Sequence, residues 1–103
     1  MRQKLLVTFF KKGDMRFISH LDLMRLFQRA LRRSGLPISI TKGFNPHPKI
    51  SVSRALKLGI ESDNEEAIFY LDRADIKPED FKERLNKQLP EGIKIKDAKT
   101  DSD

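Results

Sequence analysis

Residues 19–37, SHLDLMRLFQRALRRSGLP, carry the most complete secondary-structure signals in this chain of 103 residues. Ser19 is a favourable N-cap, Asp22 stands at the acidic position of a capping-box variant, and Gly35 with Pro37 forms a stop signal. At about 100° per residue, the apolar side chains fill one arc of a helix and the arginines fill the opposite arc. The stretch therefore predicts an amphipathic helix with a core-facing side and a strongly basic side.

Strand and helix signals on both sides of this helix complete a βαββαβ pattern. Residues 3–10 predict a central strand, residues 38–41 and 50–53 alternate with period two, and residues 66–71 predict another buried strand. Residues 55–64 are expected to connect strands, residues 77–89 to form a second helix, and residues 93–96 to form an edge strand. The order predicts an α+β, ferredoxin-like fold: an antiparallel sheet with two helices on one face.

Length and composition limit the classes of protein to consider. We expect residues 1–97 to form a single ferredoxin-like domain and residues 98–103 to form a disordered tail. The chain has no cysteine, which excludes disulfides and thiolate metal sites and suits the cytoplasm. No apolar run approaches the roughly 18 residues of a membrane span. The net charge of +6 favours an anionic partner, first nucleic acid and second an acidic protein surface.

The basic side of the helix is the first candidate site. Its arginines follow helical spacing and share a strip roughly 10–12 Å long, which can neutralise several phosphates along one strand of a nucleic acid. Arginine also suits bidentate recognition of phosphate or carboxylate. A solvated helix face is the alternative. The residues of this strip are Arg25, Arg29, Arg32 and Arg33.

The segment GFNPHP, residues 43–48, is the second candidate site. Its two prolines stiffen the backbone, and Gly43 permits a turn. We expect the loop to offer cations for phosphates and a ring for base stacking. A rigid structural loop with Phe44 packed inward and Asn45 capping a turn is the alternative. The predicted nucleic-acid-binding residues of this segment are Lys42, Phe44, Asn45, His47 and Lys49.

The two histidines are weak catalytic candidates. His20 falls on the apolar arc of the helix, which favours a structural role and would let it brace the 43–48 loop. His20 or His47 could also act as a general base or acid. A metal site formed by His20, His47 and Asp22 lacks any fixed ligand spacing, so no metal is expected. No other catalytic motif is evident. Whether the protein is an enzyme therefore stays open, and the sequence favours a binding protein.

Four ordered stretches resemble one bacterial family. They are FISHLDLMR at 17–25, RALRRSGLP at 29–37, GFNPHPKIS at 43–51 and ALKLGIES at 55–62. Over about residues 4–72 the chain resembles the uncharacterised radical SAM-linked proteins, which are encoded beside, or fused behind, a radical S-adenosylmethionine protein. Family members are typically about twice this length, so the resemblance implies an N-terminal half. It also implies that any iron–sulfur cluster and S-adenosylmethionine belong to a radical SAM partner, with no cofactor in this chain.

A weaker similarity is to the CRISPR endoribonucleases that use ferredoxin-like folds. The aromatic signature of an RNA-recognition sheet is absent, so we do not expect recognition through the open sheet face. The sequence predicts a non-catalytic module that presents the basic helix and the 43–48 loop to RNA, together with a separate radical SAM enzyme. A protein–protein adaptor that docks on that enzyme, and a metal-independent endoribonuclease that uses His20 or His47, are the alternatives.

Overall fold

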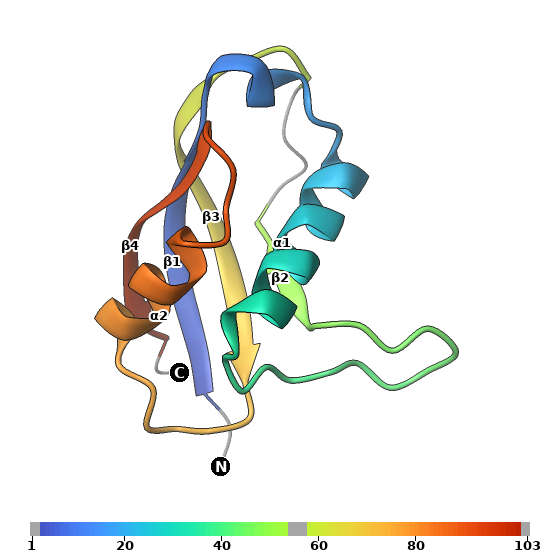
Figure 1. Ribbon diagram of the computed structural model, residues 1–103, viewed down its shortest axis with the longest axis vertical. Helices are drawn as coiled ribbons and strands as arrows, with labels where there is room; N and C mark the ends of the chain where they lie inside the picture. Colours follow the sequence, from blue (N-terminus) through green and yellow to red (C-terminus); the bar gives the residue numbers. More distant parts are fainter. Residues whose placement is uncertain (1–2, 54–57, 102–103) are drawn as a thin grey trace.

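The computed structural model describes residues 3–53 and 58–101. In chain order its elements are β1 (Gln3–Lys11), the 3-10 helix η1 (Gly13–Phe17), α1 (His20–Ser34), β2 (Ile50–Val52), β3 (Ser62–Leu71), α2 (Pro78–Asn86) and β4 (Ile93–Thr100) (Figure 1). Part of the predicted 55–64 connection, residues 55–57, lies outside the described residues.

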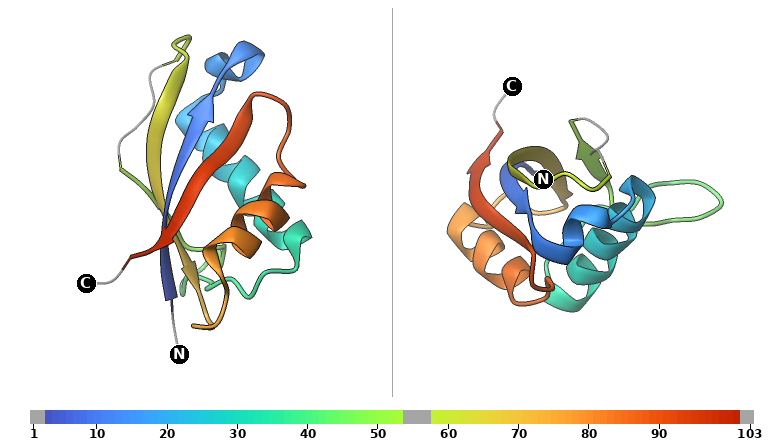
Figure 2. Two further views of the ribbon diagram at one scale, coloured as in Figure 1. Left: turned by 90° about the vertical axis from the view of Figure 1, so that its left-hand side faces the viewer. Right: turned by 90° about the horizontal axis from the view of Figure 1, so that it is seen from above.

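The four strands form one sheet in the order β2-β3-β1-β4, and each neighbouring pair is antiparallel. β1 and β2 are therefore parallel with β3 between them, while β3 and β4 are parallel with β1 between them. Both helices lie on the same side of the sheet and leave its other face open (Figure 2). This arrangement confirms the predicted α+β class and is consistent with a ferredoxin-like fold.

A single core fills the space between the sheet and the helices. Every second residue of β1 is buried, so the predicted central strand is fully buried on one face and only half-buried on the other. Four fully buried phenylalanines from β1, α1, β3 and α2 pack edge to face, with neighbouring ring centroids 5.2–5.4 Å apart. They are Phe9, Phe27, Phe69 and Phe81.

The C-terminal strand corrects the predicted tail. β4 runs through Thr100, where residues 98–103 were expected to form a disordered tail. Ala98 pairs with Val7 and is buried, and Thr100 pairs with Leu5. An edge strand needs apolar residues on one face only, so the polar composition of this segment was misleading. Residues 102–103 lie outside the described part of the chain.

Three other segments differ from the predicted strands, and the first is residues 62–64, which were expected to connect strands but begin β3. Residues 38–41 form no regular strand: Ile38 bridges Leu71 and Ile40 bridges Pro48, each in isolation. The first strand extends beyond the predicted residues 3–10, because Lys11 still belongs to β1, and the 3-10 helix η1 follows it. All three differences depend on which strands pair, and local alternation does not specify that.

Candidate nucleic-acid interface

The ends of α1 follow the predicted capping signals. Ser19 Oγ accepts a hydrogen bond from Asp22 N at 3.1 Å, and Gly35 after the helix has a φ of 74°. This left-handed conformation favours glycine, because a side chain would add strain. The helix turns its apolar side to the core through Leu23, Phe27, Ala30 and Leu31. All four arginines of the predicted strip are consequently exposed.

Two of these arginines lie on the flank of α1 that faces α2. Arg29 and Arg33 line a groove of about 420 Å³ together with Lys87, which follows α2. Apolar and uncharged polar residues complete its lining: Leu26, Ala30, Gln88, Leu89 and Pro90. This α1–α2 groove therefore combines three cations with an apolar surface.

The other two arginines, Arg25 and Arg32, do not line this groove and are turned towards the hairpin side of the helix. At about 100° per residue, Arg25 and Arg32 are within about 60° of Gln28 around the helix, and Gln28 contacts the loop that contains His47. Arg25 Nη1 lies 3.7 Å from Asp22 Oδ1, but both side chains are largely exposed, so this ion pair is weak. The four arginines thus form two pairs with different surroundings, which helical spacing alone did not reveal.

The loop is the tip of an irregular hairpin, residues 38–50, that projects from the molecule beside the C-terminal end of α1 (Figure 1). Ser39 N donates to Tyr70 O at 2.9 Å, and Lys49 N donates to Ser39 O at 2.8 Å. Nearer the tip, Thr41 N donates to His47 O at 2.8 Å. The two arms of this 38–50 hairpin are therefore bonded to each other and to the end of β3, and this anchors the projecting tip.

The tip itself is solvent-exposed. Phe44 is fully exposed, and Lys42, Asn45 and Pro46 beside it are also exposed. Gly43 has a φ of 141°, in the region that favours glycine. The alternative in which Phe44 packs inward is therefore wrong, and the predicted display of an aromatic ring between cations is the observed arrangement.

His47 is half-buried between the hairpin and α1. Its Nδ1 lies 3.3 Å from Gln28 Nε2 and 3.1 Å from Pro48 O. In one tautomer this nitrogen accepts from the glutamine, and in the other it donates to the carbonyl. His47 N also donates to Thr41 Oγ1 at 3.3 Å. These contacts give His47 a positioning role at the base of the tip.

His20 does not brace the loop as expected, because Gln28 makes that contact with His47. α1 starts at one end of the molecule and the 38–50 hairpin projects near the other (Figure 1). His20 Nδ1 is buried and has no hydrogen-bond partner among the described residues. Across residues 3–53 and 58–101, no three potential metal ligands come together.

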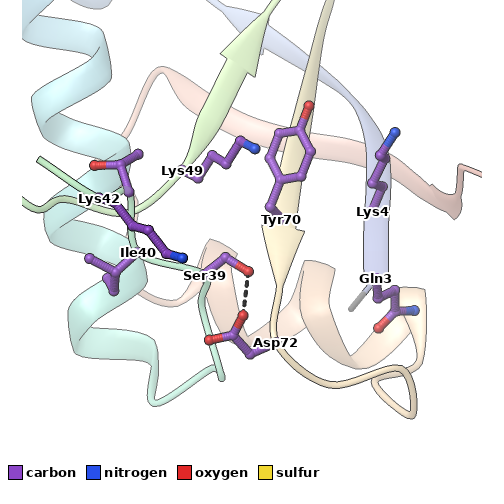
Figure 3. Close-up of a pocket in the computed structure, with 9 residues that line it drawn as sticks. Gln3, Lys4, Ser39, Ile40, Lys42, Lys49, Tyr70 and Asp72 are labelled. Carbon is purple, nitrogen blue, oxygen red and sulfur yellow. Dashed lines mark hydrogen bonds between the residues drawn. The ribbon is translucent and has the colours of Figure 1, made fainter. Parts of the chain in front are cut away.

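Sequence reasoning missed a groove of about 630 Å³ on the open face of the sheet, at the base of the hairpin (Figure 3). Lys49 Nζ lies 4.5 Å from the ring centroid of Tyr70, a cation–π contact. Ser39 Oγ donates to Asp72 Oδ1 at 2.6 Å. The lining of this Tyr70 groove comprises Gln3, Lys4, Ser39, Ile40, Thr41, Lys42, Lys49, Tyr70 and Asp72.

The signal for the Tyr70 groove was present in the sequence only in part. Alternation places Lys4 on one face of β1 and Tyr70 on one face of β3. Their proximity follows from the register, in which Lys4 and Tyr70 are directly paired. Strands this far apart in sequence do not reveal that pairing, so the site residues could not be combined beforehand.

A buried charged pair is a second feature that the sequence did not suggest. Lys11 is 1% exposed and Glu65 is 3% exposed, and both lie on the core side of the sheet. Burial lowers the pKa of Lys11, while the charge of Glu65 acts in the opposite direction. Lys11 Nζ donates to Arg16 O at 3.3 Å, and Ser62 Oγ donates to Glu65. The pair thus links β1 and β3 to η1.

Fold and surface together define a small α+β protein with a basic, projecting hairpin. A family model matches residues 4–103, with the description "Uncharacterized protein conserved in bacteria (DUF2344)". The chain therefore belongs to this bacterial family. The match extends beyond the 4–72 region of the motifs, and its description names no radical SAM enzyme. No curated protein matches the chain. Within the described ranges, no helix is both long and apolar enough to span a bilayer.

Proposed function

We propose that this protein is an RNA-binding module whose contact surface is the 38–50 hairpin and the adjoining flank of α1. The observation that carries the proposal is Phe44, which is fully exposed at the tip of a hairpin bonded to β3. An exposed aromatic ring is costly in water and suits base stacking. Because the base of the hairpin is already ordered, binding needs little further ordering of this segment.

The charges around the tip support an anionic ligand. Lys42 and Lys49 belong to the hairpin, and Arg25 and Arg32 lie within about 60° around the helix of Gln28, the residue of α1 that contacts it. Each cation that neutralises a phosphate releases counterions, so affinity depends steeply on salt. Asn45, exposed beside Phe44, can donate to and accept from base edges.

The proposal includes a partner enzyme. The resemblance to radical SAM-linked proteins supports a separate radical SAM protein that acts on the bound RNA in the cytoplasm. That partner would hold the iron–sulfur cluster and S-adenosylmethionine. The contribution of this chain would be to bind and orient the RNA.

Fluorescence anisotropy with a labelled oligouridylate, measured over a range of salt concentrations, tests RNA binding. Arg25→Ala combined with Arg32→Ala should weaken binding and reduce the salt slope by about 1.4. Arg29→Ala with Arg33→Ala is the matched control, because it removes the same charge from the other flank and should change binding little. Phe44→Ala should weaken binding roughly 5- to 150-fold without changing the slope. Salt-independent binding, or no binding, would overturn the proposal.

The α1–α2 groove favours a second function, an adaptor that docks on the radical SAM partner. Arg29, Arg33 and Lys87 line it beside apolar residues, a combination that suits an acidic protein segment with apolar anchors. A nuclease-treated pull-down of that partner should be lost with Arg29→Glu and Arg33→Glu but retained with Arg25→Glu and Arg32→Glu. The opposite pattern would exclude this groove as the docking site.

No observation favours the endoribonuclease alternative. His47 Nδ1 lies beside Gln28, and eight residues of α1, about 12 Å along the helix axis, separate Gln28 from His20. The two histidines are therefore not placed as an acid–base pair around one phosphate. When the labelled oligouridylate is incubated with the protein in the presence of EDTA, it should stay intact. Cleavage by the wild-type protein that is lost in His47→Ala would contradict this conclusion.

A further inference from the structure

We infer that the Tyr70 groove binds one unpaired nucleotide of single-stranded RNA, with its base against the Tyr70 ring and its phosphates near Lys42 and Lys49. The inference rests on the proposed function and extends it to a second surface. It also defines the ligand more narrowly, as a single strand with at least one unstacked base.

The size and walls of the groove suit a nucleotide. Its volume of about 630 Å³ falls within the usual range for small-molecule sites. One wall is pinned by Ser39, whose N donates to Tyr70 O and whose Oγ donates to Asp72 Oδ1. Lys49 N closes the same wall by donating to Ser39 O. The groove is therefore preformed.

Tyr70 provides a surface for a base. It lies on the open face of β3, directly paired with Lys4 on β1, and its side chain is half-buried. Lys49 Nζ contacts the ring at 4.5 Å from the centroid. When a nucleotide binds, its phosphate competes with the Tyr70 ring for the Lys49 ammonium. The base then stacks on the ring in place of the ammonium, and any base can make this contact.

The polar groups of the groove suit a ribonucleotide. Lys4, Lys42 and Lys49 line it, and Asp72, the one acidic residue among the described lining residues, is bonded to Ser39. The second carboxylate oxygen of Asp72 can accept from a 2′-hydroxyl or a base amino group. The lysines outnumber the carboxylate, so the groove attracts an anion while it keeps an acceptor for specificity.

The groove is continuous with the hairpin tip. Thr41 and Lys42 line the groove, and Phe44 follows only two residues later. One strand can therefore pass from the Phe44 ring to the Tyr70 ring, which requires unpaired bases at both positions. The missing RNA-recognition signature argued against the open sheet face. The groove instead uses one aromatic residue near the end of β3, together with lysines from the hairpin.

The chain contains one tyrosine and no tryptophan, so the experiment needs no assignment of rings. The ring signals of protein carrying ¹³C-tyrosine report Tyr70 alone by NMR. A short oligouridylate should shift these signals, whereas an abasic oligonucleotide of equal length and inorganic phosphate should shift them much less. Tyr70→Leu should weaken oligouridylate binding roughly 5- to 150-fold, and Tyr70→Phe should retain it.

Phe10→Leu is the matched control, because Phe10 of β1 lies on the same open face of the sheet as Tyr70. It is six residues, about 20 Å, from Lys4 along the strand, and its loss should leave binding unchanged. Salt-sensitive RNA binding with unmoved Tyr70 signals would overturn the groove assignment and leave the proposed function intact. Equal shifts with duplex RNA or with phosphate alone would overturn the unpaired-nucleotide inference. Absence of all RNA binding would overturn both.

Discussion

The two faces of the sheet differ sharply, although the same strands build both. On the core face, Phe9 and Phe69 are fully buried and pack edge to face with Phe27. On the open face, Phe10 and Tyr70 are half-buried beneath ammonium groups at 4.9 and 4.5 Å from their ring centroids. The difference indicates that one face of each strand supplies stability and leaves the other free for recognition. Substitutions should separate the two contributions.

The largest effect should come from Phe27→Ala. Phe27 is fully buried and contacts the rings of both Phe9 and Phe69, so its truncation leaves a cavity and should cost about 3–5 kcal/mol. Phe10→Ala on the open face should cost only about 1 kcal/mol, because its ring is already partly in water. Urea unfolding followed by circular dichroism measures both. Equal losses of unfolding free energy in the two variants would contradict the proposed difference between the two faces.

Lys11→Met should give the next largest loss, roughly 2–3 kcal/mol, because it leaves the Glu65 carboxylate buried without the charge of Lys11. The double variant Lys11→Met with Glu65→Leu should recover much of that loss, because both buried charges are then gone. Thermal unfolding of the wild type, the two single variants Lys11→Met and Glu65→Leu, and the double variant measures the coupling. If the double variant is as unstable as the sum of both single changes, the two residues are not a pair.

Ser19→Ala should have a smaller effect, about 1 kcal/mol, because Asp22 N loses its hydrogen-bond acceptor at the start of α1. Ser51→Ala in β2, an exposed position on the open face, serves as the control and should change stability by less than about 0.5 kcal/mol. Comparison of Ser19→Ala with Phe27→Ala shows how much of the stability comes from the cap of α1 and how much from core packing. A loss as large as that of Phe27→Ala would show that capping outweighs packing.

The smallest effect should come from Asp63→Asn. Lys12 Nζ lies 2.7 Å from Asp63 Oδ1, and this hydrogen bond lowers the pKa of Asp63 below its usual 3.8. A lowered folded-state pKa stabilises the fold above pH 3.8, and that contribution is lost as the pH falls through the lowered value. The melting temperatures of wild type and variant should therefore differ slightly at neutral pH and converge in acid. A gap that persists in acid would contradict the ion-pair explanation.

Local signals predicted α1 well, because its caps and its apolar arc involve residues close in sequence. Ser19, Asp22 and Gly35 act at the positions expected for them. The exposure of Phe44 also agreed with one of the two alternatives, since prolines on either side of His47 favour an extended, projecting loop. The division of the arginines between two flanks required the positions of α2 and the hairpin.

Contacts between distant segments were beyond local reasoning. The last residues of β4 look like a polar tail until Val7 and Leu5 of β1 pair with them. The Gln28–His47 contact depends on where the hairpin lies against α1. The Tyr70 groove needs the β1–β3 register and the hairpin base at the same time. None of these leaves a periodic pattern in the chain.

The sequence by itself determined the order of elements, the capped basic helix and the charge of the loop, because these depend on backbone preferences and side-chain periodicity within a few residues. Only the tertiary structure decided which basic residues lie together on one surface, and beside which other side chains. A one-residue change of register between β1 and β3 would move Lys4 away from Tyr70, and no local preference prevents that change. The register is set by burial of the shared phenylalanine core, so the core on one face positions the groove on the other.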